Sequence, residues 1–330
     1  MTPETEEILS LLKRVSRSFY LSLRLVPKSV RPTLSLAYLL ARASDSIADA
    51  GSAAVEFRSQ LLGQLPDSLP ASLEGTGLNA LTMAAGEEDR GPGHPGCVRK
   101  TTHGQDTHAT GSGSNGRDDC SPWALQVRML GSLPDGETEL LESLPLLLRK
   151  LDSSPDKDEI LDVWRTILSG QIFDLQRFSP GAPPLALVEA VRYTGLVAGC
   201  VGRFWTEICF KHVPGYSTAP LETMCGLGFD FGCGLQWVNI LRDRHGDAAA
   251  GRVYVTPEDF PTAMRVAREN LASGARYADL VRPRRLRAAC RLPLEIGVRT
   301  LDLVTESPQS PRVKVSRSFV WLSLARSLWH

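Results

Sequence analysis

The chain has 330 residues, of which 42% are hydrophobic and 22% are charged, an ordinary balance for a globular protein with a sizeable core. Its 37 Lys and Arg residues equal its 37 Asp and Glu residues, so net charge gives no overall attraction to nucleic acid or to an anionic membrane. The seven cysteines include no C-x-x-C pair, which argues against a disulfide framework and against a structural zinc site.

The first residues, MTPETEEILSLLKR, are acidic and lack a secretory pattern, and no uncharged apolar run reaches the ~18 residues of a membrane span. Free thiols are expected in a reducing compartment, so these features together predict a cytoplasmic protein. Peripheral contact with a membrane stays open, because it needs only a short amphipathic helix. The sequence does not decide the oligomeric state.

Helical patterns dominate the chain, in order over residues 30–50, 138–151, 156–178, 185–211, 221–244 and 284–304. No alternating strand pattern and no internal repeat accompanies them. The sequence therefore predicts an all-α fold in which residues 1–330 form a single multi-helix bundle. Residues 86–122 break the pattern because they are rich in Gly, Pro and polar residues, and we expect a disordered insertion there.

Two polar stripes, 198 positions apart, step by three or four residues, so each follows one face of a helix. The first stripe consists of Tyr38, Arg42, Asp45 and Asp49. The second stripe consists of Gln236, Asn239, Asp243 and Asp247. Each ends in two aspartates four residues apart, within sequence so apolar that an unpaired carboxylate would be costly. Carboxylates on two helix faces suit Mg²⁺ and a diphosphate, because Mg²⁺ takes few carboxylates and completes its shell with water and phosphate oxygens.

Aspartates four residues apart are also common on solvated helix faces, so the neighbouring arginines decide the interpretation. Arg42 lies one turn before Asp45, Arg242 directly precedes Asp243, and Arg252 follows the second stripe. Guanidinium groups bind phosphate oxygens through paired hydrogen bonds. The combination indicates a trimetal diphosphate clamp, in which the amide oxygens of the second stripe can join a metal shell or orient water.

Small residues form a further pattern around the segment YTGLVAGCVG, which begins at Tyr193. Another set of small residues precedes the second stripe and consists of Gly226, Gly228, Gly232 and Gly234. Smooth helix faces of this kind allow close approach either by a second helix or by a long apolar ligand. Since each glycine costs a helix roughly 1 kcal/mol, their number suggests a need for space.

Together these segments resemble the squalene and phytoene synthase family, and they occur in the family's order. The matching segments are SRSFYLSLRLVP (16–27), YLLARASDSIAD (38–49), GQIFDLQRF (170–178), YTGLVAGCVG (193–202) and LQWVNILRDRHGDAAAGRVYVTPEDF (235–260). The resemblance covers nearly the whole chain outside the insertion. It implies an isoprenoid synthase fold with a central apolar cavity, and head-to-head condensation of two prenyl diphosphates. Gly246 departs from the pattern, since carotenoid-type members often carry an acidic residue there.

The resemblance also implies roles for individual residues. Mg²⁺ is expected on Asp45, Asp49, Asp243 and Asp247, with Asn239 as a further candidate ligand. Diphosphate contacts are expected from Arg17, Arg42, Arg242 and Arg252. Further positions expected to line the site are Ser16, Phe19, Tyr38, Tyr193 and Gln236. Tyr193 or the released diphosphate would accept the proton that is lost when a cyclopropylcarbinyl diphosphate forms.

The predicted product is squalene, made from two farnesyl diphosphates with NADPH as hydride donor. Residues 311–326, PRVKVSRSFVWLSLAR, resemble a basic segment of squalene-type members whose side chains contact NADPH, so Lys314 and Arg317 are the candidates. An amphipathic helix at a membrane surface is the other interpretation of this segment. A phytoene or dehydrosqualene synthase without the reductive step is the alternative function. Cyclisation or hydrolysis of one prenyl diphosphate, and an inactive assembly partner, also stay open.

Overall fold

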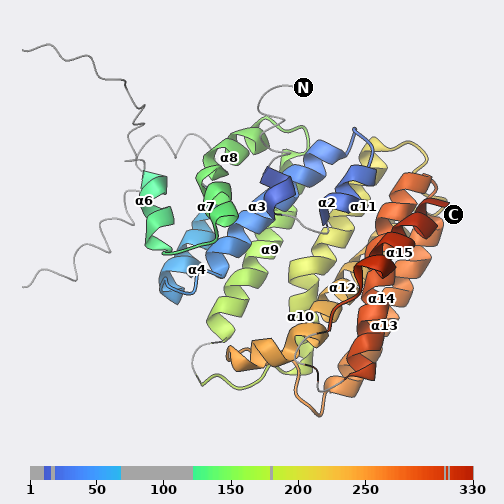
Figure 1. Ribbon diagram of the computed structural model, residues 1–330. Helices are drawn as coiled ribbons and strands as arrows, with labels where there is room; N and C mark the ends of the chain where they lie inside the picture. Colours follow the sequence, from blue (N-terminus) through green and yellow to red (C-terminus); the bar gives the residue numbers. More distant parts are fainter. Residues whose placement is uncertain are drawn as a thin grey trace, which may run out of the picture.

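The computed structural model describes residues 11–15, 19–67, 122–178, 181–307, 310 and 313–329. Residues 86–121 of the expected insertion lie outside the described residues, as do two expected site residues, Ser16 and Arg17. The elements, shown in Figure 1, are α2 (Phe19–Leu25), α3 (Arg31–Ala48), α4 (Val55–Gln64), the 3₁₀ turn η1 (Leu65–Asp67), α6 (Pro122–Met129), α7 (Asp135–Glu142), α8 (Leu144–Asp152), α9 (Lys157–Arg177), α10 (Leu187–Thr194), the π turn η2 (Gly195–Gly199), α11 (Cys200–His212), α12 (Leu221–Ala249), α13 (Phe260–Leu280), α14 (Arg284–Glu306) and α15 (Arg317–Trp329).

The predicted all-α class is confirmed. Within the described ranges the sole β contact is an isolated antiparallel bridge between Ser217 and Val281. The expected helix over 138–151 is two helices, which break at Ser143 because Pro145 starts a new first turn. None of the described helices is both long and apolar enough to cross a bilayer.

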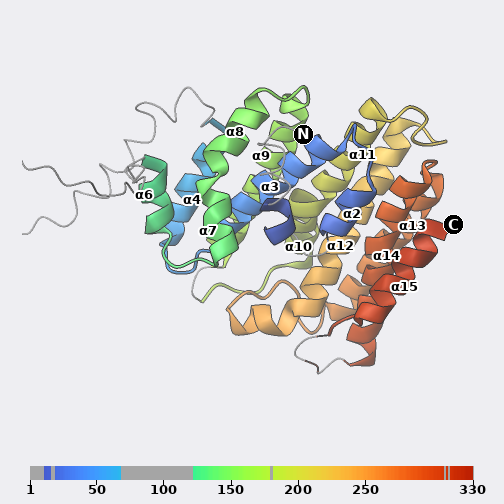
Figure 2. The same cartoon turned by 45° about the horizontal axis from the view of Figure 1, so that its top comes forward.

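From α4 onward the helices follow one another across the bundle roughly in chain order, whereas α2 packs against α14. Figures 1 and 2 both place α4 and α6 at one end and α13, α14 and α15 at the other, with α9, α11 and α12 between them. Helix α12 packs against α11, α13 and α14, whereas α9 packs against α3, α4 and α11. The two predicted polar stripes therefore lie on helices from opposite halves of the bundle.

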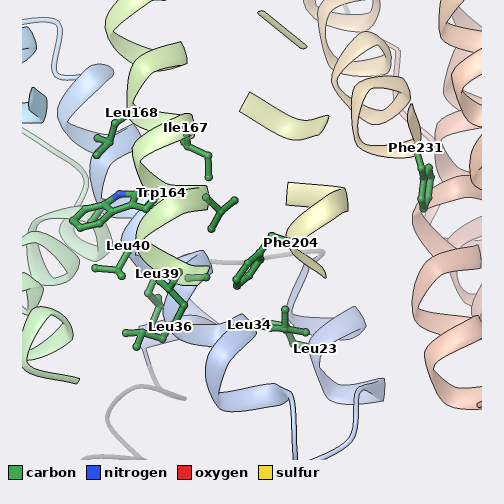
Figure 3. Packing of buried hydrophobic residues seen from close by; sticks show 14 of the residues in the cluster. Leu23, Leu34, Leu36, Leu39, Leu40, Trp164, Ile167, Leu168, Phe204 and Phe231 are labelled. Carbon is green, nitrogen blue, oxygen red and sulfur yellow. The ribbon is translucent and has the colours of Figure 1, made fainter. Parts of the chain in front are cut away.

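The apolar face of α3 fixes the direction of its polar stripe. Leu39 and Leu40 are fully buried and lie among the side chains of α9, including Trp164 (Figure 3). The Trp164 indole Nε1 also donates to Ser44 Oγ on α3 at 3.4 Å. Burial of each large apolar side chain stabilises the fold by about 1.5–3 kcal/mol. With this face held against α9, the neighbouring stripe that begins at Tyr38 cannot rotate into the core.

A buried carboxylate ties three helices together away from the stripes. Asp156 is the N-cap residue of α9, and its side chain is 1% exposed. Thr33 Oγ1 of α3 donates to Asp156 Oδ2 at 2.5 Å. Asp156 Oδ1 lies 2.7 Å from His212 Nε2 and 3.0 Å from Lys211 Nζ, both on α11. Such a carboxylate is tolerated because each oxygen has a partner.

The small residues bring α11 and α12 unusually close together. A Cβ atom on Gly202 would lie 1.9 Å from the Gly228 carbonyl oxygen, and one on Gly232 would lie 2.1 Å from the Ala198 carbonyl oxygen. A Cβ on Gly226, in contrast, would meet no atom within 4 Å. Helix packing therefore explains the glycines at 202, 228 and 232, whereas the requirement at Gly226 has no structural account.

Candidate active site

The first stripe is held by ion pairs to its own arginine. The Arg42 guanidinium donates from Nη1 to Asp45 Oδ2 and from Nη2 to Glu137 Oε1, so α7 supplies a carboxylate that the sequence analysis missed. Tyr38 is half-buried beside them. Asp49 is the C-cap residue of α3 and is exposed. The helix thus presents Asp45 and Asp49 on one side, as the spacing predicts.

Asp45 has a perturbed pKa although its side chain is still accessible to solvent. Burial, followed by repulsion from Asp49, raises the pKa of Asp45 to about 6, although the Arg42 guanidinium opposes the shift. Its side chain nevertheless keeps 46% of its accessible surface. A group that is surrounded by protein and still reachable from solvent can receive a cation, and a cation would relieve the repulsion between the two carboxylates.

The second stripe is also paired with arginines. Arg242 donates from Nε to Asp243 Oδ1 at 2.9 Å and from Nη2 to Asp243 Oδ2. Arg252 Nη2 lies 3.3 Å from Asp247 Oδ1. Burial is the largest effect on the pKa of Asp247 and raises it. The Arg252 guanidinium opposes this shift, whereas repulsion from Asp243 adds to it. These are the aspartates and arginines that the sequence predicts at this end of α12.

A turn brings Arg252 back beside α12. Gly251 has φ +81°, the left-handed conformation that glycine adopts without strain at the end of a helix. The Arg252 backbone N–H then donates to the Asp247 carbonyl oxygen at 2.8 Å. Two amides lie two to three turns before Asp247 on the helix, where Asn239 Nδ2 donates to Gln236 Oε1 at 3.4 Å. Gln236 is half-buried and Asn239 is exposed.

Asp174 of α9 links the two stripes and was not among the predicted site residues. Burial raises its pKa to about 6, and the charges of Asp49 and Asp247 push in the same direction, whereas Tyr254 and Arg252 oppose the shift. A carboxylate that senses an aspartate from each stripe lies near both of them. Its position in GQIFDLQRF was the only signal in the sequence, since a single aspartate in an amphipathic helix normally faces solvent.

Tyr254 was also missed, and it connects Asp174 to Tyr193. Its hydroxyl donates to Asp174 Oδ1 at 2.5 Å. Its ring is stacked on the ring of Tyr193, with centroids 5.3 Å apart and an interplanar angle of 25°. Phe178 meets Tyr254 edge-on at 4.8 Å between centroids. The result is an aromatic wall next to the carboxylates.

Tyr193 is a neutral phenol in this environment. Its side chain is buried, and burial together with the charges of Asp174 and Asp45 raises its pKa far above the ordinary value. It lies at the end of α10, directly before the π turn η2. Such turns occur frequently at functional sites. Tyr193 can therefore hold a hydrogen bond or present its ring, but its neutral oxygen is a weak base.

The described residues contain no group of three or more His, Cys, Asp or Glu side chains that converge on one point where an ion could bind. The predicted trimetal set is therefore not assembled by protein ligands alone. It remains compatible with Mg²⁺, which commonly uses one or two carboxylates and takes its other ligands from substrate phosphates and water. The buried Nε of Arg252 has no hydrogen-bond partner, so a donor stands free for an anion beside Asp247.

Three other predicted residues do not join this cluster among the described side chains. The Phe19 side chain is not among the described side chains, although its backbone begins α2. Lys314 and Arg317 are exposed. Arg317 opens α15, which packs mainly against α14, and α14 carries none of the predicted clamp residues. Two exposed cations do not by themselves identify a nucleotide site, so NADPH stays a prediction from the sequence alone.

A sequence model described as "Squalene/phytoene synthase" matches residues 12–272. The chain belongs to the squalene/phytoene synthase family. Family members are prenyltransferase-type enzymes that bind prenyl diphosphates and generally use Mg²⁺ to do so. The family expected from the sequence motifs is thereby confirmed.

Two curated relatives are both named "Bifunctional lycopene cyclase/phytoene synthase". The protein from Leptosphaeria maculans is 29% identical over 255 residues, which cover 77% of this chain and 34% of the relative. The protein from Pyrenophora tritici-repentis is 26% identical over 259 residues, which cover 76% of this chain and 34% of the relative. The chain thus spans about a third of the length of the curated relatives that it matches.

Solved structures similar to this squalene/phytoene synthase family member show the same fold. One is a ligand complex of TcSQS, with a TM-score of 0.67, 19% identity, and coverage of 99% of this chain and 86% of that chain. Another is a dehydrosqualene synthase with a ligand, with a TM-score of 0.58, 18% identity, and coverage of 98% and 94%. The expected isoprenoid synthase fold is therefore confirmed, whereas identities this low do not specify a reaction.

Proposed function

We propose that this chain condenses two prenyl diphosphates head to head. The observation that carries the proposal is the coupling of the two aspartate stripes through Asp174, with an arginine paired to each stripe. Two diphosphates bring several negative charges into one site, and they need cations and fixed donors on more than one side. A site for a single small anion would not need two carboxylate pairs from distant parts of the chain.

The donor set fits Mg²⁺, because carboxylates with raised pKa gain from a nearby cation. The residues that would hold it are Asp45, Asp49, Asn239, Asp243 and Asp247. The chemistry that Mg²⁺ supplies when bound is neutralisation of the charge that builds on a departing diphosphate. The arginines can neutralise the same charge, and the Nε of Arg252, which has no protein acceptor, can donate to a phosphate oxygen.

In the proposed first half-reaction, the C1–O bond of one prenyl diphosphate breaks and its electron pair leaves with the diphosphate. The double bond of the second prenyl diphosphate then forms the new carbon–carbon bond. The stacked rings of Tyr193 and Tyr254 present aromatic faces, which stabilise a passing carbocation electrostatically. Burial of these rings also keeps water from capturing the cation.

Closure of the cyclopropane ring requires the loss of one proton. Because the pKa of Tyr193 is raised, its neutral oxygen is a poor acceptor, and the released diphosphate is the better base. Tyr193 then acts as a positioning residue: it keeps the hydrocarbon chains against the aromatic wall, with Tyr254 held by Asp174. The product of this half-reaction is a cyclopropylcarbinyl diphosphate.

The second half-reaction breaks the remaining C–O bond and rearranges the ring. The product we propose is squalene from two C15 units, for which Lys314 and Arg317 would hold NADPH and NADPH would supply the hydride. Proton loss instead gives a phytoene-type product. This second candidate is favoured by the names of the two curated relatives and by the exposed position of Lys314 and Arg317.

The test is product analysis with C15 and C20 diphosphates, each with and without NADPH, in the presence of Mg²⁺. Squalene that appears only with NADPH supports the first candidate. A dehydro-C30 or C40 hydrocarbon that forms regardless of NADPH refutes it and supports the second. Cyclised or hydrolysed products of single-substrate size would overturn the condensation itself. Failure to bind Mg²⁺ and diphosphate would instead indicate an inactive partner protein.

A further inference from the structure

Helix α15 exposes two large apolar side chains while it buries two serines. Trp321 is 61% exposed and Leu322 is 50% exposed, whereas Ser323 and Ser327 face inward and are each 2% exposed. The buried Ser327 hydroxyl has no hydrogen-bond partner. A helix in contact with water alone would be more stable with the serines outside and the large apolar side chains inside. The arrangement therefore indicates that something other than water covers the outer face.

The outer face has a defined charge pattern. At about 100° per residue, the exposed positions of α15 fill one half of the helix circumference. Arg317 and Arg326 lie at the two borders of that half, and Trp321 and Leu322 lie between them together with the small side chains of Ser318 and Ala325. The sequence from Ser307 to His330 contains no Asp or Glu. An apolar strip between two cationic borders fits a surface that is apolar inside and anionic at its boundary.

We propose that the outer face of α15 docks on an anionic lipid bilayer. Trp321 and Leu322 would enter the boundary between headgroups and acyl chains, and Arg317 and Arg326 would contact anionic headgroups. Trp favours such an interface because its ring is apolar while its N–H stays near water. The helix lies on the membrane and does not cross it, in agreement with the absence of a spanning helix among the described ones.

A second copy of the chain fits this face less well. In a two-fold symmetric contact the same face meets itself, so two acid-free cationic surfaces would oppose one another. The reason for a membrane contact rests on the proposed function, because a long hydrocarbon product does not dissolve in water and has to enter a bilayer. The docking surface itself is formed by α15 alone, so the membrane contact and the condensation reaction can be refuted separately.

The test is flotation of the full chain with vesicles, without substrate, at low and high salt. Binding is expected to vesicles that contain phosphatidylglycerol, and it should be much weaker with pure phosphatidylcholine. Trp321→Ser should weaken binding by about tenfold, and Arg326→Gln by about fivefold at low salt. Val188→Ser is the matched control, since it removes an apolar side chain of 74% exposure from α10, and it should bind as the parent does.

Several outcomes would overturn the proposal. Equal binding of the parent chain and Trp321→Ser would show that another surface docks. No binding of the parent to anionic vesicles would exclude the bilayer, and a dimer that Trp321→Ser dissociates would identify a second copy as the occupant. Circular dichroism of each variant controls for folding. Activity in detergent is measured separately, so an inactive protein that still floats with vesicles refutes only the proposed function.

Discussion

Replacement of Gly202 by Ala tests whether the close approach of α11 and α12 is required. The added Cβ would lie 1.9 Å from the Gly228 carbonyl oxygen, whereas ordinary contacts begin at 3.4 Å. The neighbour is main chain, so no side chain can rotate away, and the helices must separate by roughly 1.5 Å. Gly226 offers a matched control, because a Cβ there meets nothing within 4 Å.

The expected magnitudes follow from two opposing effects. Alanine favours the helix by about 1 kcal/mol relative to glycine at either position. Overpacking costs about 1–3 kcal/mol, and the upper end applies at Gly202 because the obstacle is backbone. Gly202→Ala should therefore lower the free energy of unfolding by about 2 kcal/mol, whereas Gly226→Ala should raise it by up to about 1 kcal/mol.

The assay is urea denaturation followed by circular dichroism, with both variants and the parent measured side by side. Turnover should also fall in Gly202→Ala, because separation of the helices displaces the π turn that follows Tyr193. Equal unfolding free energies for the two variants would refute the packing argument. A stable Gly202→Ala with normal turnover would also show that this contact does not position the site.

Three further predictions concern single side chains. Asp243→Asn should reduce turnover by on the order of a hundredfold with little change in stability, since it removes a charge from the proposed diphosphate clamp; near-normal turnover in a steady-state assay would count against the clamp. Tyr254→Phe keeps the ring but removes the hydroxyl that donates to Asp174. Turnover should therefore fall by about tenfold while the circular dichroism spectrum is unchanged. An unaltered rate would show that this hydrogen bond is dispensable. Burial alone would raise the pKa of Asp156, but the hydrogen bonds from its three partners leave that pKa lowered. The ionised carboxylate therefore stabilises the fold at neutral pH, and this contribution is lost as pH falls below about 4. Asp156→Asn should accordingly lower the unfolding free energy by about 2 kcal/mol at pH 7 and by much less at pH 3, and an equal loss at both values would contradict this assignment.

The sequence predicted the helices and the stripes because both depend on local periodicity. Spacings of three and four residues placed Asp45 and Asp243 on their helix faces whatever the tertiary fold. Asp174 and Tyr254 could not be found in this way, because their relevance arises only when α9 meets the turn after α12. Glu137 was missed for the same reason, since its partner Arg42 lies 95 positions away along the chain.

The role of the small residues likewise depends on what lies next to each one in three dimensions. A glycine that leaves room for a ligand and one that leaves room for a backbone look identical in sequence. The structure separates them at Gly202, where the obstacle is the Gly228 carbonyl group. Similarly, the tail segment that begins near Lys314 could be interpreted from sequence as a nucleotide contact or as a surface helix, and its pattern alone does not show which side chains are exposed.

The π turn η2 sets the angle between the aromatic wall and the helix pair. Tyr193 and Gly202 are nine residues apart, which in an uninterrupted α-helix places them about 180° apart, on opposite sides. A π turn absorbs one extra residue, so the angle falls to about 80°. The phenol can thus face Tyr254, beyond the end of α12, while the glycine meets α12 itself. One inserted residue in a continuous helical segment therefore directs Tyr193 to the aromatic wall and Gly202 to α12, in nearly perpendicular directions.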